Sequence, residues 1–400
     1  MKIKVGVIFG GESVEHEVSI ISAIQAINKM DLEKYEIVPI YISKTGEWFT
    51  GDLLKDIETF QDINLIKRYA KNVVLYRRKD QFVLQTKGIF KRIVNQLDIA
   101  FPIVHGTNVE DGILQGYLQS IGIPYVGSNV YASVVGQDKI YMKQIFKEQN
   151  LPIPSYLWFY DVDYKEDSNK IINDVSKLGY PVIVKPATLG SSIGIHPAKN
   201  EQELIEAIED AINYDSRILV EEMIPNLVEV NISVLGNYQH QKTSLIEEVL
   251  TGNEFLTYED KYIGSTKSKG KVRFSKGMAS ATRKIPASLS ENLEKNVKDI
   301  AIKAFRALGS SGVCRIDFLV DSKKQKAYIN EINSIPGSLA FYLWEPTGKK
   351  YTDLLDEMIT IAIRDYKRRI SKTHSFESNI LEGFNGTKGL KGMKGNGKLR

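Results

Sequence analysis

Apolar and polar residues alternate along the first forty residues in a way that predicts a strand, a helix and a second strand. Residues 3–7 alternate between apolar and other side chains up to Gly10-Gly11, and a period of two is typical of a strand with one buried face. Residues 18–27 instead have apolar positions at helical spacing, and 35–42 again read as a strand. A strand, a glycine turn and a helix begin an α/β unit. We therefore expect a mixed α/β fold whose N-terminal domain, residues 1–127, holds a Rossmann-like parallel sheet.

The remainder of this domain carries hairpins and one loop of chemical interest. Residues 44–97 contain strand-like runs with polar breaks and no chemical motif, so we interpret them as a hairpin elaboration. Residues 98–104 form another apolar run, which ends at His105-Gly106. Because α/β folds bind ligands in loops at the carboxyl ends of parallel strands, His105 is a candidate ligand contact. A hydrogen bond within its own loop is the alternative role for this histidine.

A lysine inside an apolar strand marks the second domain, residues 128–224. Lys185 ends the run Tyr-Pro-Val-Ile-Val-Lys and is followed by a glycine and serine loop at 188–194. Burying an ammonium group without a partner is unfavourable, so this lysine is expected to bind an anion. The backbone N-H and hydroxyl groups of the loop can surround phosphate oxygens, although the loop lacks the G-x-x-x-x-G-K-[ST] pattern of a P-loop. A helix that carries Lys139 is expected to begin at Asp138.

An acidic hairpin at residues 312–338 has the clearest chemistry in the chain. Its two runs, CRIDFLV and AYINEINS, are separated by a polar turn. In a strand, residues i and i+2 share a face, so Arg315 and Asp317 lie together on the first strand. Glu331 and Asn333 lie together on the second. Two carboxylates and an amide oxygen are ligands of the kind that Mg²⁺ takes. The alternative is a solvated hairpin of alternating charge, which the apolar surroundings of the acids disfavour.

The rest of the third domain, residues 225–372, reads as a lid and further helices. The long polar segment 254–281 is typical of a mobile lid. The spacing Ser288-x-x-Glu291 predicts a capped helix. Beyond the domain, glycines recur at every third residue without proline, and we expect residues 373–400 to form a disordered basic tail.

Composition narrows the class of protein. The 400 residues carry a formal net charge of +4 and are 42% hydrophobic and 26% charged, which is typical of globular domains. No apolar run approaches the roughly 20 residues of a membrane span. The single cysteine, Cys314, excludes an internal disulfide and fits a reducing cytoplasm. We therefore expect a cytoplasmic protein, with neither a membrane nor nucleic acid as its partner.

Six blocks of sequence stand out in order along the chain. They are GGESVEHEVSIISA, HGTNVEDGILQGYLQSIGIPYVGS, DKIYMK, PVIVKPATLGSSIGI, YEDKY, and CRIDF with INEINSIPG. Together, over about residues 3–370, they resemble the D-alanine-D-alanine ligase family, a branch of the ATP-grasp enzymes. The lysine strand and the acidic hairpin are common to many ATP-grasp ligases, whereas the blocks around Glu15 and His105 are specific. The resemblance implies a three-domain ATP-grasp fold.

The resemblance also implies a reaction and a set of site residues. ATP would phosphorylate the carboxylate of one D-alanine, and the amine of a second would attack the acyl phosphate to give D-alanyl-D-alanine for peptidoglycan. Mg²⁺, or Mn²⁺ in its place, and a homodimer are implied as well. By position, the catalytic residues would be Glu15, Ser191, Tyr262, Arg315 and Gly337; the substrate-binding residues Glu15, His105, Ser338 and Tyr342; the ATP-binding residues Lys139, Lys185, Ser191, Glu221, Glu222, Glu229 and Lys261; and the metal ligands Asp317, Glu331 and Asn333.

Individual roles follow from the same resemblance. Glu15 would hold the ammonium group of the first D-alanine, linked through Ser191 to Tyr262. Glu221 and its neighbours would contact adenine, and Glu229 the ribose. Arg315 and the N-H of Gly337 would form the oxyanion hole.

The acceptor stays open at this point. After Gly337 the family usually continues with small hydroxyl residues that bind the carboxylate of the acceptor, whereas this chain has Ser-Leu-Ala-Phe-Tyr-Leu-Trp at 338–344. A D-alanine-D-serine ligase, or a ligase for another amino acid, is therefore an alternative. A nucleotide-binding module that has lost catalysis is a second alternative, because a fold alone does not fix a function.

Overall fold

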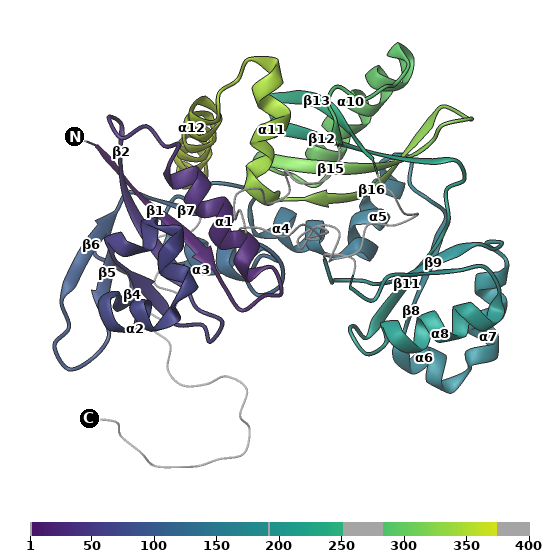
Figure 1. Cartoon of the computed structure of the whole chain (residues 1–400), viewed down its shortest axis with the longest axis horizontal. Helices are drawn as coiled ribbons and strands as arrows, with labels where there is room; N and C mark the ends of the chain where they lie inside the picture. The colour runs from purple at the N-terminus through teal and green to yellow at the C-terminus, as the bar shows by residue number, and fades with distance from the viewer. Residues whose placement is uncertain (1, 191–192, 251–282, 374–400) are drawn as a thin grey trace, which may run out of the picture.

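The chain folds into three β-sheets that follow one another across the molecule, with helices around them (Figure 1). The computed structural model describes residues 2–190, 193–250 and 283–373. The mixed α/β class predicted from the sequence is confirmed. Several sequence predictions lie outside the described residues, namely those for Ser191, Lys261, Tyr262, the lid at 254–281 and the tail after residue 373.

The first sheet combines a parallel centre with an antiparallel extension, in the order β6-β5-β4-β3-β2-β1-β7. Its strands are β1 (Ile3–Gly10), β2 (Tyr35–Ile42), β3 (Trp48–Thr50), β4 (Lys71–Arg78), β5 (Gln81–Thr86), β6 (Ile93–Leu97) and β7 (Ile99–Pro102). β1 pairs in parallel with β2 and β7, whereas β2 to β6 pair antiparallel. The predicted Rossmann-like sheet is thus confirmed for three strands, and the predicted hairpins extend it.

Helices cover this sheet, and one of them comes from the other end of the chain. Those from the N-terminal part are α1 (His16–Ile27), η1 (Asp52–Lys55), η2 (Ile57–Gln61), α2 (Ile63–Tyr69) and α3 (Ile113–Ile121). The next helix, α4 (Val130–Gln137), contacts α3, the helix of residues 139–148 and the strand of residues 326–333. The last helix, α12 (Tyr351–Ile370), adds Leu354, Leu355 and Met358 to the buried apolar cluster that contains β1 and β2. The same cluster contains Leu235 and Val313 of the third sheet, whose strands at residues 227–236 and 312–321 also contact α12, so this helix joins the first sheet to the third.

The second sheet is antiparallel and carries the lysine strand. Its order is β10-β9-β11-β8, with β8 (Tyr156–Tyr160), β9 (Val182–Pro186), β10 (His196–Ala198) and β11 (Arg217–Glu222). The helices α6 (Asp161–Glu166), α7 (Ser168–Ser176) and α8 (Glu201–Ala211) belong to the same part of the chain. Lys185 pairs with Leu219, and Ile183 with Glu221. Because cross-strand partners share a face, Lys185 and Glu221 are diagonal neighbours on one side of this sheet.

The third sheet holds the acidic hairpin, in the order β14-β13-β12-β15-β16. Its strands are β12 (Leu227–Gly236), β13 (Gln241–Val249), β14 (Arg283–Lys284), β15 (Gly312–Asp321) and β16 (Lys326–Asn333). The predicted hairpin is confirmed as β15 and β16, which pair antiparallel with a bulge after Asp317. The remaining elements are α5 (Lys139–Glu148), α10 (Glu291–Ala307), η4 (Gly337–Ala340), α11 (Phe341–Trp344) and η5 (Glu345–Thr347).

The cap of α10 differs from the sequence prediction by two residues. Ser290, not Ser288, is the N-cap, and its Oγ accepts a hydrogen bond from the backbone N-H of Leu293 at 3.4 Å. Ser288 instead donates its backbone N-H to Glu248 of the neighbouring strand at 3.1 Å. The tertiary contact therefore decides between two serines that have similar local sequence.

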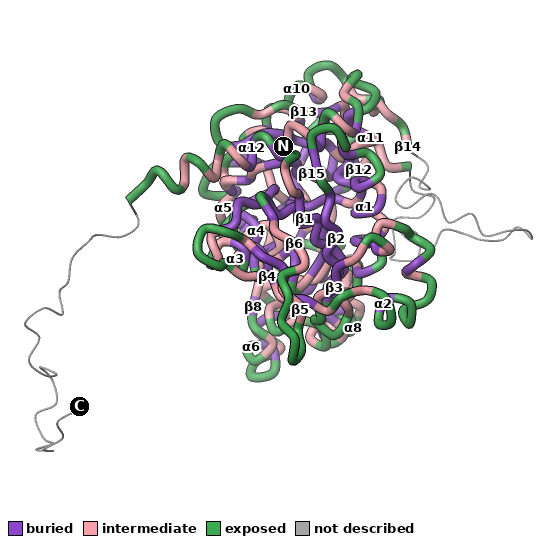
Figure 2. Tube along the Cα trace, turned by 90° about the vertical axis from the view of Figure 1, so that its left-hand side faces the viewer, coloured by how far each residue is buried: buried purple, intermediate pink, exposed green. Residues whose placement is uncertain are grey.

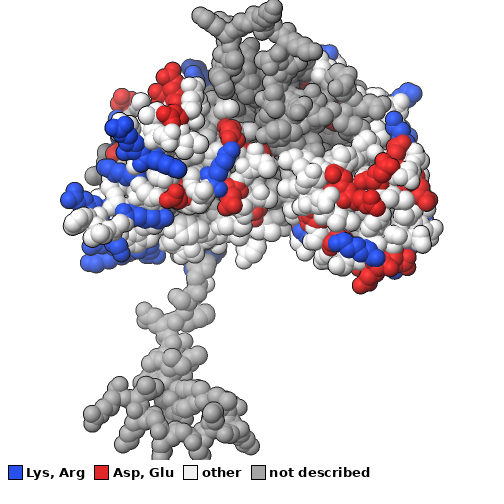
Figure 3. All heavy atoms as spheres, turned by 60° about the horizontal axis from the view of Figure 1, so that its bottom comes forward, with Lys and Arg blue, Asp and Glu red and all other residues white. Residues whose placement is uncertain are grey.

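Burial and charge are unevenly distributed over the molecule. Figure 2 shows buried segments along β1, β2, β12 and β15, with exposed segments on the outer helices and loops. In Figure 3, acidic side chains gather on the right-hand part of the face and basic ones on the left-hand part. The small net charge of +4 therefore hides opposite local charges. No helix in the described part of the chain has the length and apolar character needed to cross a membrane.

Candidate active site

A cavity of about 520 Å³ lies where the three sheets meet. Cavities of this size are typical of small-molecule sites. Its walls come from β9 and β10, from all five strands of the third sheet, and from the loops that follow β1 and β7. Many of the residues predicted from the sequence lie on these walls, namely Glu15, His105, Lys139, Lys185, Glu229, Arg315, Asp317, Glu331, Asn333 and Gly337. The fold thus brings separate motifs of the chain to one place.

A row of polar side chains crosses four strands of the third sheet. Asp317 of β15 pairs with Glu331 of β16 on one side and with Asn231 of β12 on the other. Asn231 in turn pairs with Glu247 of β13, and all four residues line the cavity. The i, i+2 argument predicted the Asp317 and Glu331 part of this row. It missed Glu247, because the pairing of β13 with β12 has no local signal.

Asp317 is held by donors on its own strand and on the next. Arg315 Nε donates to Asp317 Oδ1 and Arg315 Nη2 to Oδ2, each at 2.7 Å. The Asn333 amide also donates to Oδ2, at 3.1 Å. Burial alone would lower the pKa of Arg315, but the Asp317 carboxylate outweighs it and raises that pKa well above its ordinary value. Arg315 is therefore a fixed cation on the wall of the cavity, suited to a phosphate or an oxyanion.

The donor set at this hairpin fits Mg²⁺. Asp317 and Glu331 are cross-strand partners, and Asn333, two residues after Glu331 on the same strand, adds an amide oxygen. Mg²⁺ is usually bound through one or two carboxylates, while waters and substrate phosphates complete its shell. In residues 2–190, 193–250 and 283–373, no three or more Asp, Glu, His or Cys side chains converge on one point. The protein would therefore supply two carboxylates and one amide as metal ligands.

Two lysines share one buried carboxylate beside the cavity. Lys143 Nζ lies 2.5 Å from Glu221 Oε1, and Lys185 Nζ lies 2.5 Å from Oε2. Burial alone would raise the pKa of Glu221, but the two ammonium groups hold it at about 2. Lys185 also donates to Asn330 Oδ1 at 3.0 Å. The sequence pointed to Lys185 and missed the role of Lys143. The spacing of four residues between Lys139 and Lys143 on one helix was the available signal.

Glu221 and Glu222, predicted with their neighbours to contact adenine, turn their carboxylates to other groups of the protein. Neither residue is among those that line the cavity. The Glu221 carboxylate is enclosed by its two lysines, and Glu222 accepts the backbone N-H of Ser155 at 2.9 Å. The wall in this part of the cavity is apolar and is formed by Ile183, Met223, Ile224, Leu227, Phe318 and Leu319. Such a wall suits a flat base, and it includes Met223 and Ile224, which directly follow Glu221 and Glu222 in the chain.

Glu15 lies where two glycine loops pass close to it. A Cβ on Gly106 would lie 3.0 Å from Glu15 Oε2 and 2.4 Å from Ser13 Oγ, and Gly106 has a φ of +79°. A Cβ on Gly190 would lie 3.4 Å from the same carboxylate oxygen. Only glycine fits at position 106 without displacing these groups. The two loops thus approach Glu15 closely enough to enclose a small substrate beside it.

His105 and Glu110 belong to one buried loop. His105 Nε2 lies 3.2 Å from Ser22 Oγ. Glu110 accepts the backbone N-H groups of Gly106 and Ile335, at 3.1 and 2.9 Å. Burial, and then the charge of Glu15, raises the pKa of Glu110 to about 7. Glu110 was not predicted as a site residue, because its partner Ile335 is more than two hundred residues away in the chain.

The residues predicted to bind the acceptor lie on the turn after β16. Ser338 is buried and donates its backbone N-H to Ser22 Oγ at 2.9 Å. Arg283 lies over the ring of Tyr342, with 4.4 Å between the guanidinium carbon and the ring centroid. Arg283 Nε is 3.1 Å from Glu247 Oε1, and both residues line the cavity. Burial raises the pKa of Glu247 although Arg283 opposes it. Arg283 and Glu247 thus form a charged wall that the sequence did not reveal.

Two family models match most of the chain. Residues 4–128 match the model described as D-ala D-ala ligase N-terminus, and residues 145–360 match the one described as D-ala D-ala ligase C-terminus. The chain belongs to the D-alanine-D-alanine ligase family. The family predicted from the six sequence blocks is confirmed.

Relatives and solved structures agree over nearly the whole length. The chain is 38% identical over 380 residues to the D-alanine-D-alanine ligase of Thermosipho melanesiensis, covering 95% of this chain and 98% of the relative. It is 39% identical over 384 residues to that of Natranaerobius thermophilus, covering 94% and 100%. The D-alanine-D-alanine ligase structure from Coxiella burnetii matches with a TM-score of 0.76 at 30% identity, over 92% of this chain and 96% of that one. The VanG D-Ala:D-Ser ligase of Enterococcus faecalis matches with 0.75 at 28% identity, over 90% and 100%. The predicted ATP-grasp fold is confirmed.

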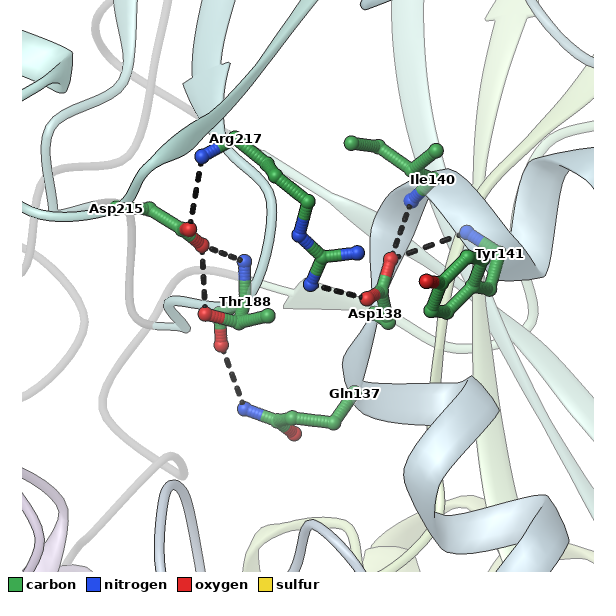
Figure 4. Close-up of polar contacts among 7 residues, drawn as sticks. All are labelled: Gln137, Asp138, Ile140, Tyr141, Thr188, Asp215 and Arg217. Carbon is green, nitrogen blue, oxygen red and sulfur yellow. Dashed lines mark hydrogen bonds and ion pairs between the residues drawn. The ribbon is translucent and has the colours of Figure 1, made fainter. Parts of the chain in front are cut away.

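A polar network in this D-alanine-D-alanine ligase family member fixes the start of the loop after the lysine strand (Figure 4). Asp215 Oδ2 accepts both the backbone N-H and the hydroxyl of Thr188, at 2.9 and 2.7 Å. Gln137 donates to the carbonyl of Thr188 at 3.0 Å. Lys139 then closes the arrangement, since its N-H donates to Ala187 O at 3.0 Å and its Nζ to Leu189 O at 2.5 Å.

A buried ion pair holds the helix end that carries Lys139. Arg217 Nη2 lies 2.5 Å from Asp138 Oδ2, while Asp138 Oδ1 caps α5 by accepting the N-H groups of Ile140 and Tyr141 at 3.0 Å. Arg217 also lies over the Tyr141 ring, 5.1 Å from its centroid (Figure 4). The loop and the helix end are therefore joined to the same stretch of chain at residues 215–217.

Asp215→Asn is expected to weaken ATP binding through this loop. The amide oxygen of asparagine accepts less strongly than a carboxylate, so the paired hydrogen bonds to Thr188 weaken. A loss of one to two such bonds corresponds to a rise of about tenfold in the KM for ATP. Steady-state kinetics with varied ATP measures this. Asp174→Asn, which removes an exposed ion pair with Lys177 on the same part of the chain, is the control and should leave that KM unchanged. Equal effects of the two variants would contradict the assignment.

Glu110→Gln is expected to remove a pH dependence of stability. The folded-state pKa of Glu110 is raised to about 7, so its contribution to stability is fully present below about pH 4.5 and is lost as the pH rises through about 7. The free energy of unfolding of the wild-type chain should therefore fall by about 3 kcal/mol relative to that of the variant across this window. Thermal unfolding of both proteins from pH 4.5 to 8 measures the difference. Parallel curves over the whole range would contradict it.

Proposed function

We propose that the protein is an ATP-dependent ligase that joins two D-alanine molecules through a D-alanyl phosphate. The observation that carries the proposal is the single cavity in which the lysine strand, the acidic hairpin, Glu15 and Gly337 meet. The lysine strand and the acidic hairpin suit a nucleoside triphosphate. Glu15 suits the ammonium group of an amino acid, and the N-H of Gly337 suits the oxyanion of a tetrahedral intermediate. Relatives about 40% identical are named D-alanine-D-alanine ligases, which supports this choice of substrate.

ATP is proposed to lie along the side of the cavity formed by β9 and β12. The adenine would rest on the apolar wall that includes Met223 and Ile224, with Glu229 at the ribose. Lys139 and Lys185, both on the wall of the cavity, would bind the phosphates. Lys261 would join them, as the family resemblance implies. A D-alanine-D-alanine ligase structure from Bacillus anthracis was determined as a complex with ATP, which supports ATP as the nucleotide.

Asp317, Glu331 and Asn333 are proposed to hold Mg²⁺, or Mn²⁺ in its place. An ion held by these residues would supply positive charge that neutralises the charge developing on the phosphates. Around it, the chain's own residues orient the reactants. Lys185 keeps its position because Glu221 holds it, and Arg315 keeps its position because Asp317 holds it on two atoms.

The first D-alanine is proposed to lie between Glu15 and Arg315. Glu15 would bind its ammonium group, with Ser191 and Tyr262 completing the contact. A carboxylate oxygen of this D-alanine attacks the γ-phosphorus of ATP, and ADP leaves with the electron pair of the broken bond. The amine of the second D-alanine then attacks the acyl carbon. Arg315 and the N-H of Gly337 stabilise the oxyanion that forms. Collapse of this intermediate expels inorganic phosphate, and the amine loses one proton to give the dipeptide.

A second candidate differs only in the acceptor. Apart from Ser338, the segment at 338–344 lacks the usual small hydroxyl residues. Arg283 lies over Tyr342 of this segment and pairs with Glu247. The VanG D-Ala:D-Ser ligase is a structural neighbour at 28% identity. A carboxylate beside an arginine can bind an additional polar group of the acceptor. His105 and Ser338 would then face the acceptor rather than the first D-alanine. We place D-alanine first because the full-length relatives carry that name.

Release of ADP in the presence of ATP, Mg²⁺ and single or paired D- and L-amino acids tests the proposal, with products identified by mass. We expect D-alanine alone to give D-alanyl-D-alanine. Turnover that requires D-serine or a larger amine would favour the second candidate, and no turnover with any amino acid would contradict both. A homodimer and a cytoplasmic location are further parts of the proposal. The single, buried Cys314 supports the second of these.

A further inference from the structure

The turn that carries Gly337 is held by side chains from the N-terminal part of the chain. Glu110 Oε1 accepts the Ser334 hydroxyl at 3.1 Å and the backbone N-H of Ile335 at 2.9 Å. Three residues further on, the backbone N-H of Ser338 donates to Ser22 Oγ at 2.9 Å. Gly337 itself faces the cavity. The turn is therefore fixed on both sides of the glycine whose N-H the mechanism uses.

The backbone after Gly337 adopts a conformation that needs such support. Ser338, Leu339 and Ala340 have φ values of +53°, +51° and +50°, which is the left-handed region that residues with a Cβ rarely adopt. Strained backbone of this kind persists only where the surroundings hold it, and it is concentrated at functional sites. Two of the side chains, those of Leu339 and Ala340, are fully buried. The Ser22 contact lies at the first residue of the left-handed stretch.

Ser22 also bears on which ring nitrogen of His105 carries the proton. Ser22 is buried on α1, and its hydroxyl oxygen already accepts the N-H of Ser338. Its own proton is then available for His105 Nε2, which lies 3.2 Å away. Burial lowers the pKa of His105, whereas the charge of Glu15 and a hydrogen bond with the backbone of Ile335 oppose this shift. If Ser22 donates to Nε2, that nitrogen is the acceptor of the neutral imidazole, and Nδ1 carries the proton.

We propose that Ser22 and His105 are positioning residues that lock the turn of residues 334–338, so that the N-H of Gly337 is aimed at the oxyanion of the tetrahedral intermediate. The chain of contacts runs from Ser338 N-H to Ser22 Oγ and from Ser22 O-H to His105 Nε2. The His105 ring in turn hydrogen-bonds the backbone of Ile335. These contacts hold the backbone before Gly337, at Ile335, and after it, at Ser338. This proposal rests on the proposed ligase activity, because it assigns the turn a role in that reaction.

A second serine on the same helix provides a matched comparison. Ser19 is buried as deeply as Ser22. Its Oγ accepts the backbone N-H of Gly10 at 2.7 Å and donates to the carbonyl of Ile103 at 2.7 Å. It therefore makes two hydrogen bonds from one hydroxyl, as Ser22 does, but neither reaches the turn. Loss of either hydroxyl removes the same atom from the same helix.

Steady-state kinetics of Ser22→Ala, Ser22→Cys and Ser19→Ala in the full chain tests the role in the reaction. We expect Ser22→Ala to lower kcat by about tenfold to a hundredfold, with the KM for ATP changed by less than about twofold. Ser22→Cys keeps the side-chain volume but is a weak donor and acceptor, so its kcat should fall between those of the wild type and Ser22→Ala. Ser19→Ala should keep the wild-type kcat. A Ser22→Cys variant as active as wild type, or equal losses in Ser19→Ala and Ser22→Ala, would overturn the proposal.

The tautomer of His105 provides a test that does not depend on turnover. In ¹⁵N NMR spectra of the full chain, with the His105 signals assigned by their absence in His105→Gln, we expect a protonated Nδ1 and an unprotonated Nε2. Ser22→Ala should weaken this preference, whereas Ser19→Ala should not. A proton on Nε2 in the wild-type protein would overturn the proposal even if ligation is confirmed. If no ligation is found but the tautomer is as expected, the proposed function fails and the hydrogen-bonded arrangement stands without its catalytic role.

Discussion

Glu221→Gln is expected to lower the free energy of unfolding by about 3–5 kcal/mol, because breaking a buried ion pair leaves an uncompensated charge. Here two ammonium groups, those of Lys143 and Lys185, lose their shared counterion. Ligation should be lost as well, since Lys185 would no longer be held at the wall of the cavity. Thermal unfolding and ADP release by the purified variant measure the two effects.

Two further variants separate this explanation from a general effect of the substitution. Glu222→Gln changes the next residue, whose carboxylate accepts only a backbone N-H from Ser155 among the contacts of the described residues, and it should be close to wild type. Adding Lys143→Met to Glu221→Gln removes one of the two unpaired charges and should recover part of the lost stability. The explanation is wrong if the double variant is less stable than Glu221→Gln alone.

Glu331→Gln is expected to lower kcat/KM by about a thousandfold at ordinary Mg²⁺ concentration, because the loss of several kcal/mol of charge stabilisation corresponds to a factor of this order. Glu331 is the cross-strand partner of Asp317 and lies on the wall of the cavity. An amide oxygen is a weaker ligand than a carboxylate, so the apparent affinity for Mg²⁺ should fall and excess metal should recover part of the activity.

Glu294→Gln provides the control for the metal site. Glu294 lies on α10 and pairs with Lys298 at a partly exposed position, 2.6 Å apart. Its substitution removes the same charge without touching the cavity. A Glu331→Gln variant with normal Mg²⁺ dependence, or an equal loss in Glu294→Gln, would show that Glu331 is not a metal ligand.

The period-two alternation of a strand correctly predicts which side chains lie together when a site is built on a single pair of strands. Arg315 and Asp317 share a face, and their partners Asn333 and Glu331 lie opposite them as predicted. The lysine strand, the hairpin elaboration and the helix after Asp138 also follow from local pattern, because their apolar positions repeat at the period of the element that buries them. The same reasoning could not find Glu247 or Arg283, since the order of strands in a sheet is a long-range property.

Contacts between distant parts of the chain account for the other differences. The partners of the Glu221 carboxylate could not be found from local sequence, because one of its two lysines is on α5, some eighty residues earlier. α12 follows the acidic hairpin in the chain, and its apolar face joins the first and third sheets in one buried cluster. Glu110 and Ser22 become site residues only because the turn after β16 reaches them. Such partners depend on how the three sheets pack together.

The fate of one oxygen atom tests the central claim most directly. D-Alanine labelled with ¹⁸O in its carboxylate is incubated with ATP, Mg²⁺ and the protein, and the released phosphate and the peptide are examined by mass spectrometry. If the carboxylate attacks ATP and the acyl phosphate is then opened by an amine, one labelled oxygen appears in each phosphate, together with ADP and D-alanyl-D-alanine. Phosphate without label, or AMP in place of ADP, would contradict the acyl phosphate and with it the roles proposed for Arg315 and Gly337.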